Sequence, residues 1–428
     1  MSAYSVSRRA LLGAGAGMTA ASLLGLRPAA AQQKDIRVFW WGSQERADRT
    51  NRAVDAFKKA NSGIDAKTEF AGWSDYWPRL ATRVAGRNAP DLIQMDYRYM
   101  FEYARRGAIV PLDQYLGSAL KIEGFDKANL ESCSVDGKLF GINLGVNSSC
   151  AVYDTAAWEA AGVEPLTFGT SWDEFSAKCA AFAKGNKRRR FYATMDASGH
   201  EPAFELWLVQ HGKVLYTEAG QLGFDEKDAA GWFKLWADMR KSGGCVPADV
   251  QALDKSTLDT STLTLGYAAT AFPHSNQFVG LQQLNKAKLA ITAVPVTAGG
   301  KPGQYLKPSQ MWSVTSDSKS PDIAVKLANY SVVDPEGSKI LGVERGVPAS
   351  AAVRDLLSPT LDEVSRSVVD YIGKLGPYTA KLPPSPPKGA GEVFTVLERV
   401  SQEVGFGVSP EEGGKKFVTE AVSILKRG

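Results

Sequence analysis

Hydrophobic residues in the first part of the chain switch between two spacings. Residues 35–40 alternate as a strand does, and residues 46–60 repeat at the helical period, which brings Ala53, Val54 and Phe57 to one face. The same alternation continues with a strand over 64–70, a helix over 73–85 and a strand over 92–95. Strands that alternate with helices in this way predict an α/β fold whose parallel sheet is wound by helical crossovers.

The strand predicted over 92–95 runs directly into Asp96, Tyr97, Arg98 and Tyr99. In an open α/β sheet, ligands sit in the crevice beyond the carboxyl ends of the strands. A carboxylate, a guanidinium and two phenols at that position suit a ligand that is rich in hydroxyl groups. We therefore expect residues 96–99 to form a loop along one wall of a binding crevice.

The remaining pattern predicts a second set of elements. An Asp-Gly turn at 136–137 indicates a hairpin, and the extended stretch over 143–153 is a candidate connector between two domains. Further strands are expected over 265–272, 289–296 and 311–315, and helices over 172–183, 204–210, 229–241 and 321–332. The chain from residue 335 is expected to be mostly helical, apart from a proline-rich segment at 382–387 that must be extended.

The length and net charge of the chain limit the classes of function that it can have. A chain of 428 residues is long enough for two domains with separate cores. Its 44% hydrophobic and 22% charged residues are typical of globular proteins. The formal net charge of +4 is small for this length and gives no support to nucleic-acid binding.

The N-terminus has the pattern of an export signal. Arg8 and Arg9 precede a weakly apolar run over 13–26, and residues 28–31 supply small side chains for cleavage after Ala31. A membrane anchor is the alternative, but the run is short and rich in Gly and Ala. We therefore predict that residues 1–31 are a twin-arginine signal peptide and that the mature protein is soluble in the periplasm.

The inventory of reactive side chains is sparse. Three histidines without metal-ligand spacing predict no metal and no other cofactor. Nucleophile-elbow and phosphate-loop motifs are absent from the sequence, while paired carboxylates for glycoside hydrolysis are not excluded. The sequence leaves open whether the cysteines form two disulfides or stay free; they are Cys133, Cys150, Cys179 and Cys245.

Aromatic and amide side chains gather at the predicted strand ends and loops. An indole can cover the apolar C–H face of a pyranose, while the sugar hydroxyls need planar polar partners. The stacking candidates are Trp40, Trp41, Tyr97, Tyr99, Trp172, Trp207 and Trp312, and the polar candidates are Asp96, Asn143, Asn147, Asn276, Gln277, Gln310 and Arg345. Core packing is the more frequent role for any single tryptophan, but the collective pattern favours a carbohydrate site.

Several short motifs recur in a specific order along the chain. They are Phe-Trp-Trp-Gly at 39–42, Gly-Trp-Ser-Asp-Tyr-Trp at 72–77, the segment 83–96, Asp-Gly-Lys-Leu-Phe-Gly at 136–141, and the segments 152–154, 275–277, 344–348 and 408–412. In order and spacing they resemble the extracellular solute-binding proteins (family 1) of carbohydrate ABC transporters, over nearly the whole mature chain. One departure is Asp-Thr at 154–155, where many members have Asn-Lys, which affects a turn more than the site.

The resemblance implies the type II fold of periplasmic binding proteins, with two α/β lobes joined by hinge strands and a sugar between them. The implied limits are 32–144 and 290–334 for lobe 1, and 145–289 and 335–428 for lobe 2. The ligand-binding residues expected from the implied cleft loops are Trp40, Trp41, Gly42, Ser43, Gln44, Asp96, Tyr97, Asn147, Trp172, His274, Asn276, Gln310, Trp312 and Arg345.

The resemblance also implies a function in transport. It implies a monomer that captures a mono- or oligosaccharide, or an acidic derivative such as a uronate or sulfosugar, and delivers it to inner-membrane ABC permease subunits. Arg345, helped by Arg46 and Arg98, is a candidate partner of a ligand carboxylate or sulfonate, with a structural ion pair to Glu344 or another lobe residue as the alternative. A secreted carbohydrate-active enzyme, a hydrolase or lyase, is the alternative function.

Overall fold

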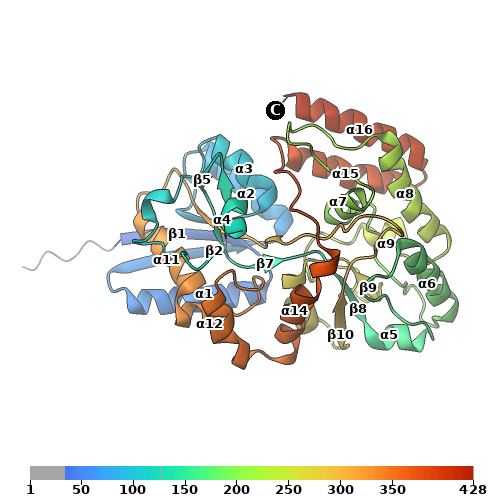
Figure 1. The fold of residues 1–428 in the computed structure, drawn as a ribbon, viewed down its shortest axis with the longest axis horizontal. Helices are drawn as coiled ribbons and strands as arrows, with labels where there is room; N and C mark the ends of the chain where they lie inside the picture. Colours follow the sequence, from blue (N-terminus) through green and yellow to red (C-terminus); the bar gives the residue numbers. More distant parts are fainter. Residues whose placement is uncertain (1–33, 126, 428) are drawn as a thin grey trace, which may run out of the picture.

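The computed structural model describes residues 34–125 and 127–427 and arranges them as two lobes side by side (Figure 1). The predicted twin-arginine signal lies outside the described residues. Each lobe has a hydrophobic core of its own, one around Trp40 and Leu92 and the other around Phe175 and Trp232. The α/β, two-lobed fold expected from the sequence is confirmed.

Lobe 1 is built on a five-stranded sheet of order β2-β1-β3-β12-β6. Its strands are β1 (Lys34–Trp41), β2 (Ile64–Ala71), β3 (Leu92–Met95), β6 (Ile142–Asn143) and β12 (Met311–Val314). β1 pairs in parallel with β2 and β3, as the alternating pattern predicts, whereas β12 is antiparallel to both β3 and β6. The sheet is therefore parallel only where the chain alternates strand and helix.

Helices pack on this sheet through faces that the helical period already indicates. The α1 residues Ala53, Val54 and Phe57 are buried, and the last two lie in the lobe 1 core. The helices of lobe 1 are α1 (Gln44–Ala60), α2 (Trp73–Ala85), α3 (Tyr97–Arg105), α4 (Lys127–Ser132), α11 (Pro321–Val333) and α12 (Pro335–Leu341), with a short hairpin of β4 (Ser134–Val135) and β5 (Lys138–Leu139) and the turn η1 (Asp113–Tyr115).

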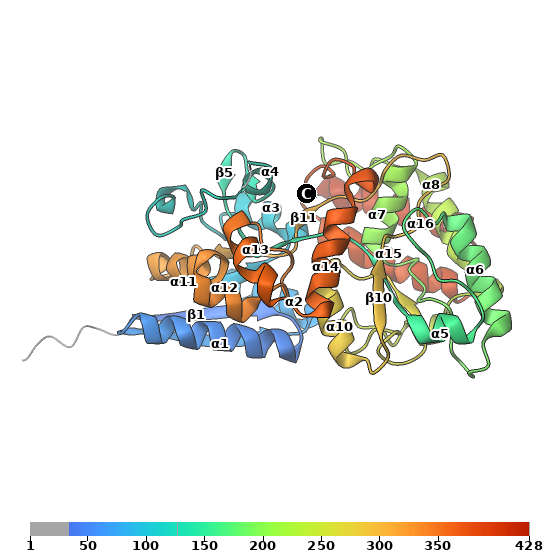
Figure 2. The ribbon, with the colours of Figure 1, turned by 60° about the horizontal axis from the view of Figure 1, so that its bottom comes forward.

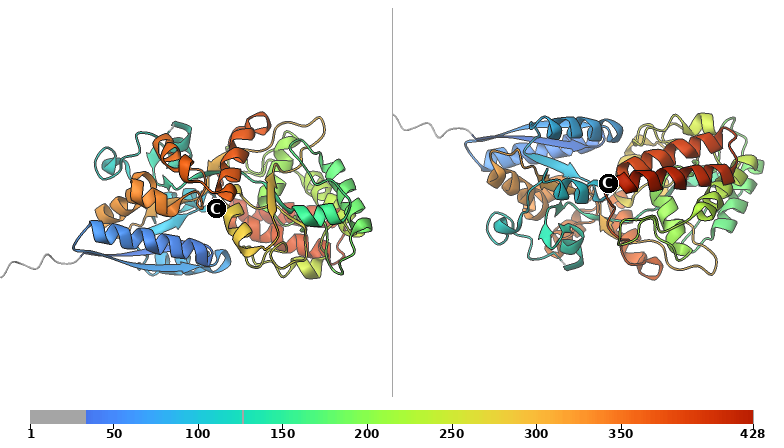
Figure 3. Two further views of the ribbon diagram at one scale, coloured as in Figure 1. Left: turned by 90° about the horizontal axis from the view of Figure 1, so that it is seen from below. Right: turned by 90° about the horizontal axis from the view of Figure 1, so that it is seen from above.

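Lobe 2 has a small antiparallel sheet of order β10-β8-β9 surrounded by helices. The strands are β8 (Ala151–Asp154), β9 (Thr270–Ala271) and β10 (Leu289–Thr292), and the helices are α5 (Thr155–Ala160), α6 (Trp172–Gly185), α7 (Glu201–Gln210), α8 (Glu226–Lys241), α9 (Ala248–Gln251), α10 (Phe278–Leu284), α14 (Glu363–Lys374), α15 (Ala390–Gly405) and α16 (Pro410–Arg427), with the turns η2 (Ser275–Gln277), η3 (Ser358–Thr360) and η4 (Gly376–Tyr378). The C-terminal α15 and α16 lie side by side along one face of this lobe (Figure 3).

Three segments cross between the lobes and meet at one point. β7 (Val146–Asn147) pairs with β11 (Lys307–Pro308), and Val146 also exchanges backbone hydrogen bonds of 2.7 and 2.9 Å with Val347. Gly145 permits this contact, because a Cβ there would lie only 2.7 Å from the carbonyl oxygen of Arg345. Figure 2 shows β11 and α13 (Ala351–Leu357) in this region between the lobes. This meeting point is the candidate hinge.

Two of the expected lobe limits differ from the observed packing. β10, which begins at Leu289, pairs with β8 of lobe 2, because its apolar residues complete that sheet, so the return to lobe 1 comes later and runs through β11. α12, expected in lobe 2, packs on α1 and α11 of lobe 1. The last crossing therefore follows α12 and not residue 334.

Two local expectations were also wrong. Residues 97–99 begin α3 and are not a loop, because Asp96 caps the helix by accepting a 2.9 Å hydrogen bond from the Arg98 N–H. The strand expected over 265–272 is reduced to Thr270–Ala271, since the residues before it form turns with Gly266 at φ 76°.

The cysteine question is resolved by geometry. All four cysteines are buried free thiols.

Within the described residues, no helix is long and apolar enough to cross a bilayer.

Candidate functional site

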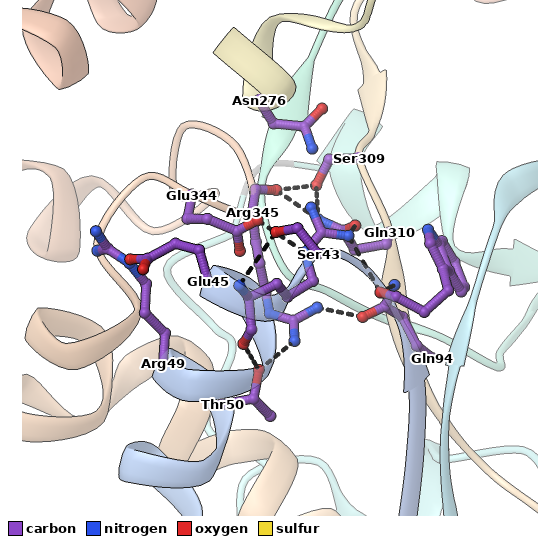
Figure 4. Close-up of polar contacts among 12 residues, drawn as sticks. Ser43, Glu45, Arg49, Thr50, Gln94, Asn276, Ser309, Gln310, Glu344 and Arg345 are labelled. Atoms are coloured by element: carbon purple, nitrogen blue, oxygen red, sulfur yellow. Dashed lines mark hydrogen bonds and ion pairs between the residues drawn. The ribbon is translucent and has the colours of Figure 1, made fainter. Parts of the chain in front are cut away.

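A polar network surrounds the N-terminus of α1, where β1 ends (Figure 4). Gly42 is required there because a Cβ would lie 2.3 Å from Arg46 Cδ. Ser43 caps α1 by accepting a hydrogen bond from the Arg46 N–H at 3.3 Å. Arg46 then reaches Glu344 Oε1 at 2.8 Å and Gln310 Oε1 at 3.0 Å. The network ties the first turn of α1 to the crossing segment.

Arg345 lies within this network, and its side chain is buried. Its guanidinium donates to Gln94 Oε1 and, at 2.6 Å, to Thr50 Oγ1, and it lies 5.2 Å above the ring of Trp312. The expected alternative, an ion pair with Glu344, is wrong, because Glu344 pairs with Arg46. Burial, with a smaller contribution from the Arg46 charge, lowers the pKa of Arg345 to about 9.

Lobe 2 approaches the hinge through an amide pair and an imidazole. Asn147 Nδ2 donates to Asn276 Oδ1 at 2.7 Å. The His274 backbone N–H donates to Gln277 Oε1 at 2.8 Å, while the ring Nε2 of His274 has no partner among the described residues. Burial holds the pKa of His274 well below its usual range, so its ring is neutral.

A pocket between the lobes is lined by side chains from both. Its space is about 400 Å³ when its opening to solvent is included, and its interior takes only a few water-sized spheres. The lining residues are Asp96, Tyr97 and Arg98 of lobe 1, Glu201, Glu205, Leu215 and Tyr216 of lobe 2, Tyr305 and Lys307 of the return segment, and Leu382, Pro383, Pro384 and Pro386 of the proline-rich segment. The lobes are thus drawn together in this conformation, and a larger ligand enters only when they part.

One ion pair crosses the pocket from lobe to lobe. Arg98 Nη2 lies 2.7 Å from Glu201 Oε1, and both side chains are little exposed. The same guanidinium lies 4.2 Å from the ring of Phe394 on α15. Lys307 differs from Arg98, because no carboxylate among the described residues lies within 4.0 Å of its ammonium. Lys307 is therefore the pocket cation that remains available to a ligand.

Burial raises the pKa of one carboxyl group and three phenols of the pocket. Burial raises the pKa of Glu205 to about 7, and Tyr305 donates its hydroxyl proton to that carboxyl group. Burial also raises the pKa of Tyr97, Tyr216 and Tyr305 above that of a free phenol. These phenols remain hydrogen-bond donors at physiological pH.

The structure separates the residues predicted from the sequence into three groups. Asp96 and Tyr97 line the pocket. Gly42, Ser43, Asn147, His274, Asn276, Gln310 and Arg345 lie around the hinge and the α1 network, while the Gln44 side chain donates to Asp48 on the surface of α1. The third group is buried in the cores and consists of Trp40, Trp41, Trp172 and Trp312. Their burial favours the packing interpretation.

Most residues of the pocket could not be predicted from the sequence. Glu201, Glu205 and Tyr216 belong to no motif, and Tyr305 and Lys307 lie about two hundred residues from Asp96 along the chain. The proline-rich segment was visible as an extended stretch, but its position over the pocket depends on how the last crossing returns to lobe 2.

Comparisons with known proteins agree with this architecture. An extracellular solute-binding protein family 1 from Alicyclobacillus acidocaldarius is 31% identical, with a TM-score of 0.66 over 92% of this chain and 98% of that one. An oligogalacturonide binding protein from Yersinia enterocolitica, solved with saturated digalacturonic acid, is 24% identical, with a TM-score of 0.82 over 92% and 99%. A periplasmic solute binding protein from Pectobacterium atrosepticum is 23% identical, with a TM-score of 0.81 over 92% and 99%. At these lower identities the likeness shows the fold alone.

Curated relatives match a shorter part of the chain. A binding protein of Brucella abortus is 24% identical over 258 residues, which are 58% of this chain and 60% of that protein. The family model described as bacterial extracellular solute-binding protein matches residues 52–362, which include both lobes and the hinge. The chain therefore belongs to the bacterial extracellular solute-binding proteins, a family that binds solutes and is not catalytic.

Proposed function

We propose that this protein captures a carbohydrate in the pocket between the lobes and delivers it to the permease of an ABC importer. The observation that carries the proposal is a pocket whose polar side chains come from both lobes and from the return segment. A ligand held there contacts both lobes at once, so it stabilises the closed form over the open one. The permease then recognises the closed form.

The chemistry of the lining suits a polyhydroxylated ligand. The phenols of Tyr97 and Tyr216 can donate hydrogen bonds, and Asp96 and the remaining carboxyl oxygens of Glu201 and Glu205 can accept them. Sugar hydroxyls do both, so they match this mixture better than an apolar solute does. Support also comes from proteins of similar fold whose names state a sugar, among them a Listeria monocytogenes ABC substrate-binding protein with cycloalternan and a Thermotoga lettingae ABC solute binding protein with α-D-tagatose.

The available cation of the pocket favours an acidic sugar. Arg98 is neutralised by Glu201, and Arg345 is enclosed in lobe 1 by Gln94 and Thr50. Lys307 is left to meet a ligand carboxylate or sulfonate, such as that of a uronate or sulfosugar. A neutral mono- or oligosaccharide is the alternative, and the experiment below distinguishes the two.

Export to the periplasm completes the proposal. The twin-arginine pattern before Ala31 directs the folded chain across the membrane, and the mature protein then works as a monomer beside its permease. The assignment to a binding family removes the hydrolase or lyase considered from the sequence.

The decisive experiment is calorimetric titration of the mature chain with matched neutral and acidic sugars. A Lys307→Met variant removes the pocket charge but keeps most of the side-chain volume. The exposed Lys319, which has no ion-pair partner among the described residues, gives the control Lys319→Met. We expect acidic sugars to bind the parent and the control alike, and the Lys307 variant roughly 10- to 100-fold more weakly. Equal affinity of all three proteins for an acidic sugar overturns the role of Lys307, and the absence of any sugar binding overturns the carbohydrate proposal.

A further inference from the structure

A second cavity lies in lobe 1, away from the pocket between the lobes. It lies between β6, α11, α12 and the crossing segment, and its lining residues are almost all buried. The interior has room for about one water-sized sphere. It is too small for a sugar and is unrelated to the proposed transport ligand.

Three hydrogen-bond donors of this cavity have no partner among the described residues. They are Asn143 Nδ2, Ser338 Oγ and Arg345 Nε, and their residues all line the cavity. The orientation of the Asn143 amide is fixed, because its Oδ1 accepts from the Gly145 N–H at 2.9 Å. Buried donors are normally paired in folded proteins, so three unpaired ones around a single space indicate a missing acceptor.

The charged side chains around the cavity also indicate a missing acceptor. Arg46 and Glu344 neutralise each other, but Arg345, of which 1% is exposed, has only the neutral partners Gln94 and Thr50. No carboxylate among the described residues lies within 4.0 Å of its guanidinium. A buried charge without a counter-charge is costly, so an acceptor that also carries a negative charge is favoured over a neutral one.

We propose that this cavity is a binding site for a small monovalent anion of halide size, held by Asn143, Ser338 and Arg345. The size of the space excludes carboxylates of metabolites, and chloride, which is larger than a water molecule, fits with small shifts of the lining side chains. The crossing segment passes through Arg345, so a bound anion also fixes the lobe 1 end of the hinge. The site is independent of the sugar pocket and goes beyond the proposed function.

The test uses the mature chain without sugar. Crystals grown in sodium bromide should show an anomalous peak in the cavity, beside the three donors. In solution, the midpoint of thermal unfolding should rise by roughly 2–4 °C in sodium bromide relative to sodium fluoride at equal ionic strength, because an ion that binds only the folded state stabilises it. Fluoride is the better general stabiliser, so a larger effect of bromide indicates a specific site.

Two serines of the same cavity provide a matched pair of variants. Ser338→Ala removes an unpaired donor, whereas Ser331→Ala removes a hydroxyl that already donates to the Leu327 carbonyl at 2.9 Å. We expect the bromide effect to shrink in the first and to persist in the second. Equal loss in both variants, or no bromide peak and no difference between bromide and fluoride, overturns the site and leaves a cavity that holds only water. Because no sugar is present, failure of the carbohydrate proposal does not affect this result.

Discussion

The carboxyl group of Glu205 makes a quantitative prediction about stability and pH. Its folded-state pKa is raised from 4.5 to about 7, chiefly because burial disfavours the ionised form. Between these two values the folded protein holds a proton that the unfolded chain has released. The stabilisation is therefore fully present below pH 4.5 and is lost as the pH rises through about 7.

The size of the effect follows from the same rise in pKa. Each unit of pKa corresponds to about 1.4 kcal/mol, so a rise from 4.5 to about 7 corresponds to about 3 kcal/mol of unfolding free energy. The side chain is only partly shielded from solvent, so we expect about 2–3 kcal/mol. Glu205→Gln keeps an acceptor for Tyr305 and cannot ionise. It should match the parent at pH 4.5 and exceed it at pH 8 by this amount, which is about 2–4 °C in melting temperature for a chain of this length.

The assay is thermal unfolding of the parent and the variant from pH 4.5 to 8. Glu398 and Asp254 also have raised pKa values, so the parent curve alone does not isolate Glu205, but the difference between the two proteins does. The exposed Glu363 provides the control Glu363→Gln, which should follow the parent. A variant that loses stability in parallel with the parent across this range, or that is less stable at pH 8, would refute the assignment of a buried, protonated Glu205.

Three further predictions test the packing and the closed form. Glu201→Gln removes the charge that pairs with Arg98 across the lobes, so the closed form should lose about 1–2 kcal/mol, or five- to thirtyfold in population. The radius of gyration without ligand should then rise in solution scattering. An unchanged scattering curve would contradict a stabilising role of this ion pair. Trp172→Ala should lower the free energy of unfolding by about 3–5 kcal/mol in denaturant titration, because the indole packs against Trp232 and donates to Gln210. A variant that folds normally but loses sugar binding would instead support a stacking role. The four thiols should react with a disulfide reagent only after unfolding, because they are buried and burial raises the pKa of each. The pKa of Cys133, for example, is raised to about 12. Rapid labelling of the native protein would contradict their burial.

Local patterns in the sequence determined a large part of this protein. The period of Ala53, Val54 and Phe57 fixed the buried face of α1, and Ser171 with Glu174 fixed the start of α6 through a capping box. Such features depend on residues within one or two turns, so the sequence contains their full cause. The order of the short motifs indicated the family for a related reason, since each motif belongs to one local turn or strand end of the shared fold.

Only the tertiary structure decided which side chains share a space. Asp96 was predicted as a ligand contact from its strand end, but Glu201, Glu205 and Lys307 reach the same pocket through the crossings between the lobes, whose paths no local pattern encodes. Packing also decided whether each tryptophan lies in a core or in the cleft. An indole at a strand end is compatible with both positions until the opposing layer is known. Arg345 depends most on the tertiary structure. The sequence left open a ligand anion or an ion pair, such as one with its neighbour Glu344, but in the fold Glu344 pairs with Arg46 and Arg345 is enclosed by neutral groups. Charge pairing is a property of distances in three dimensions, and adjacency along the chain does not determine it.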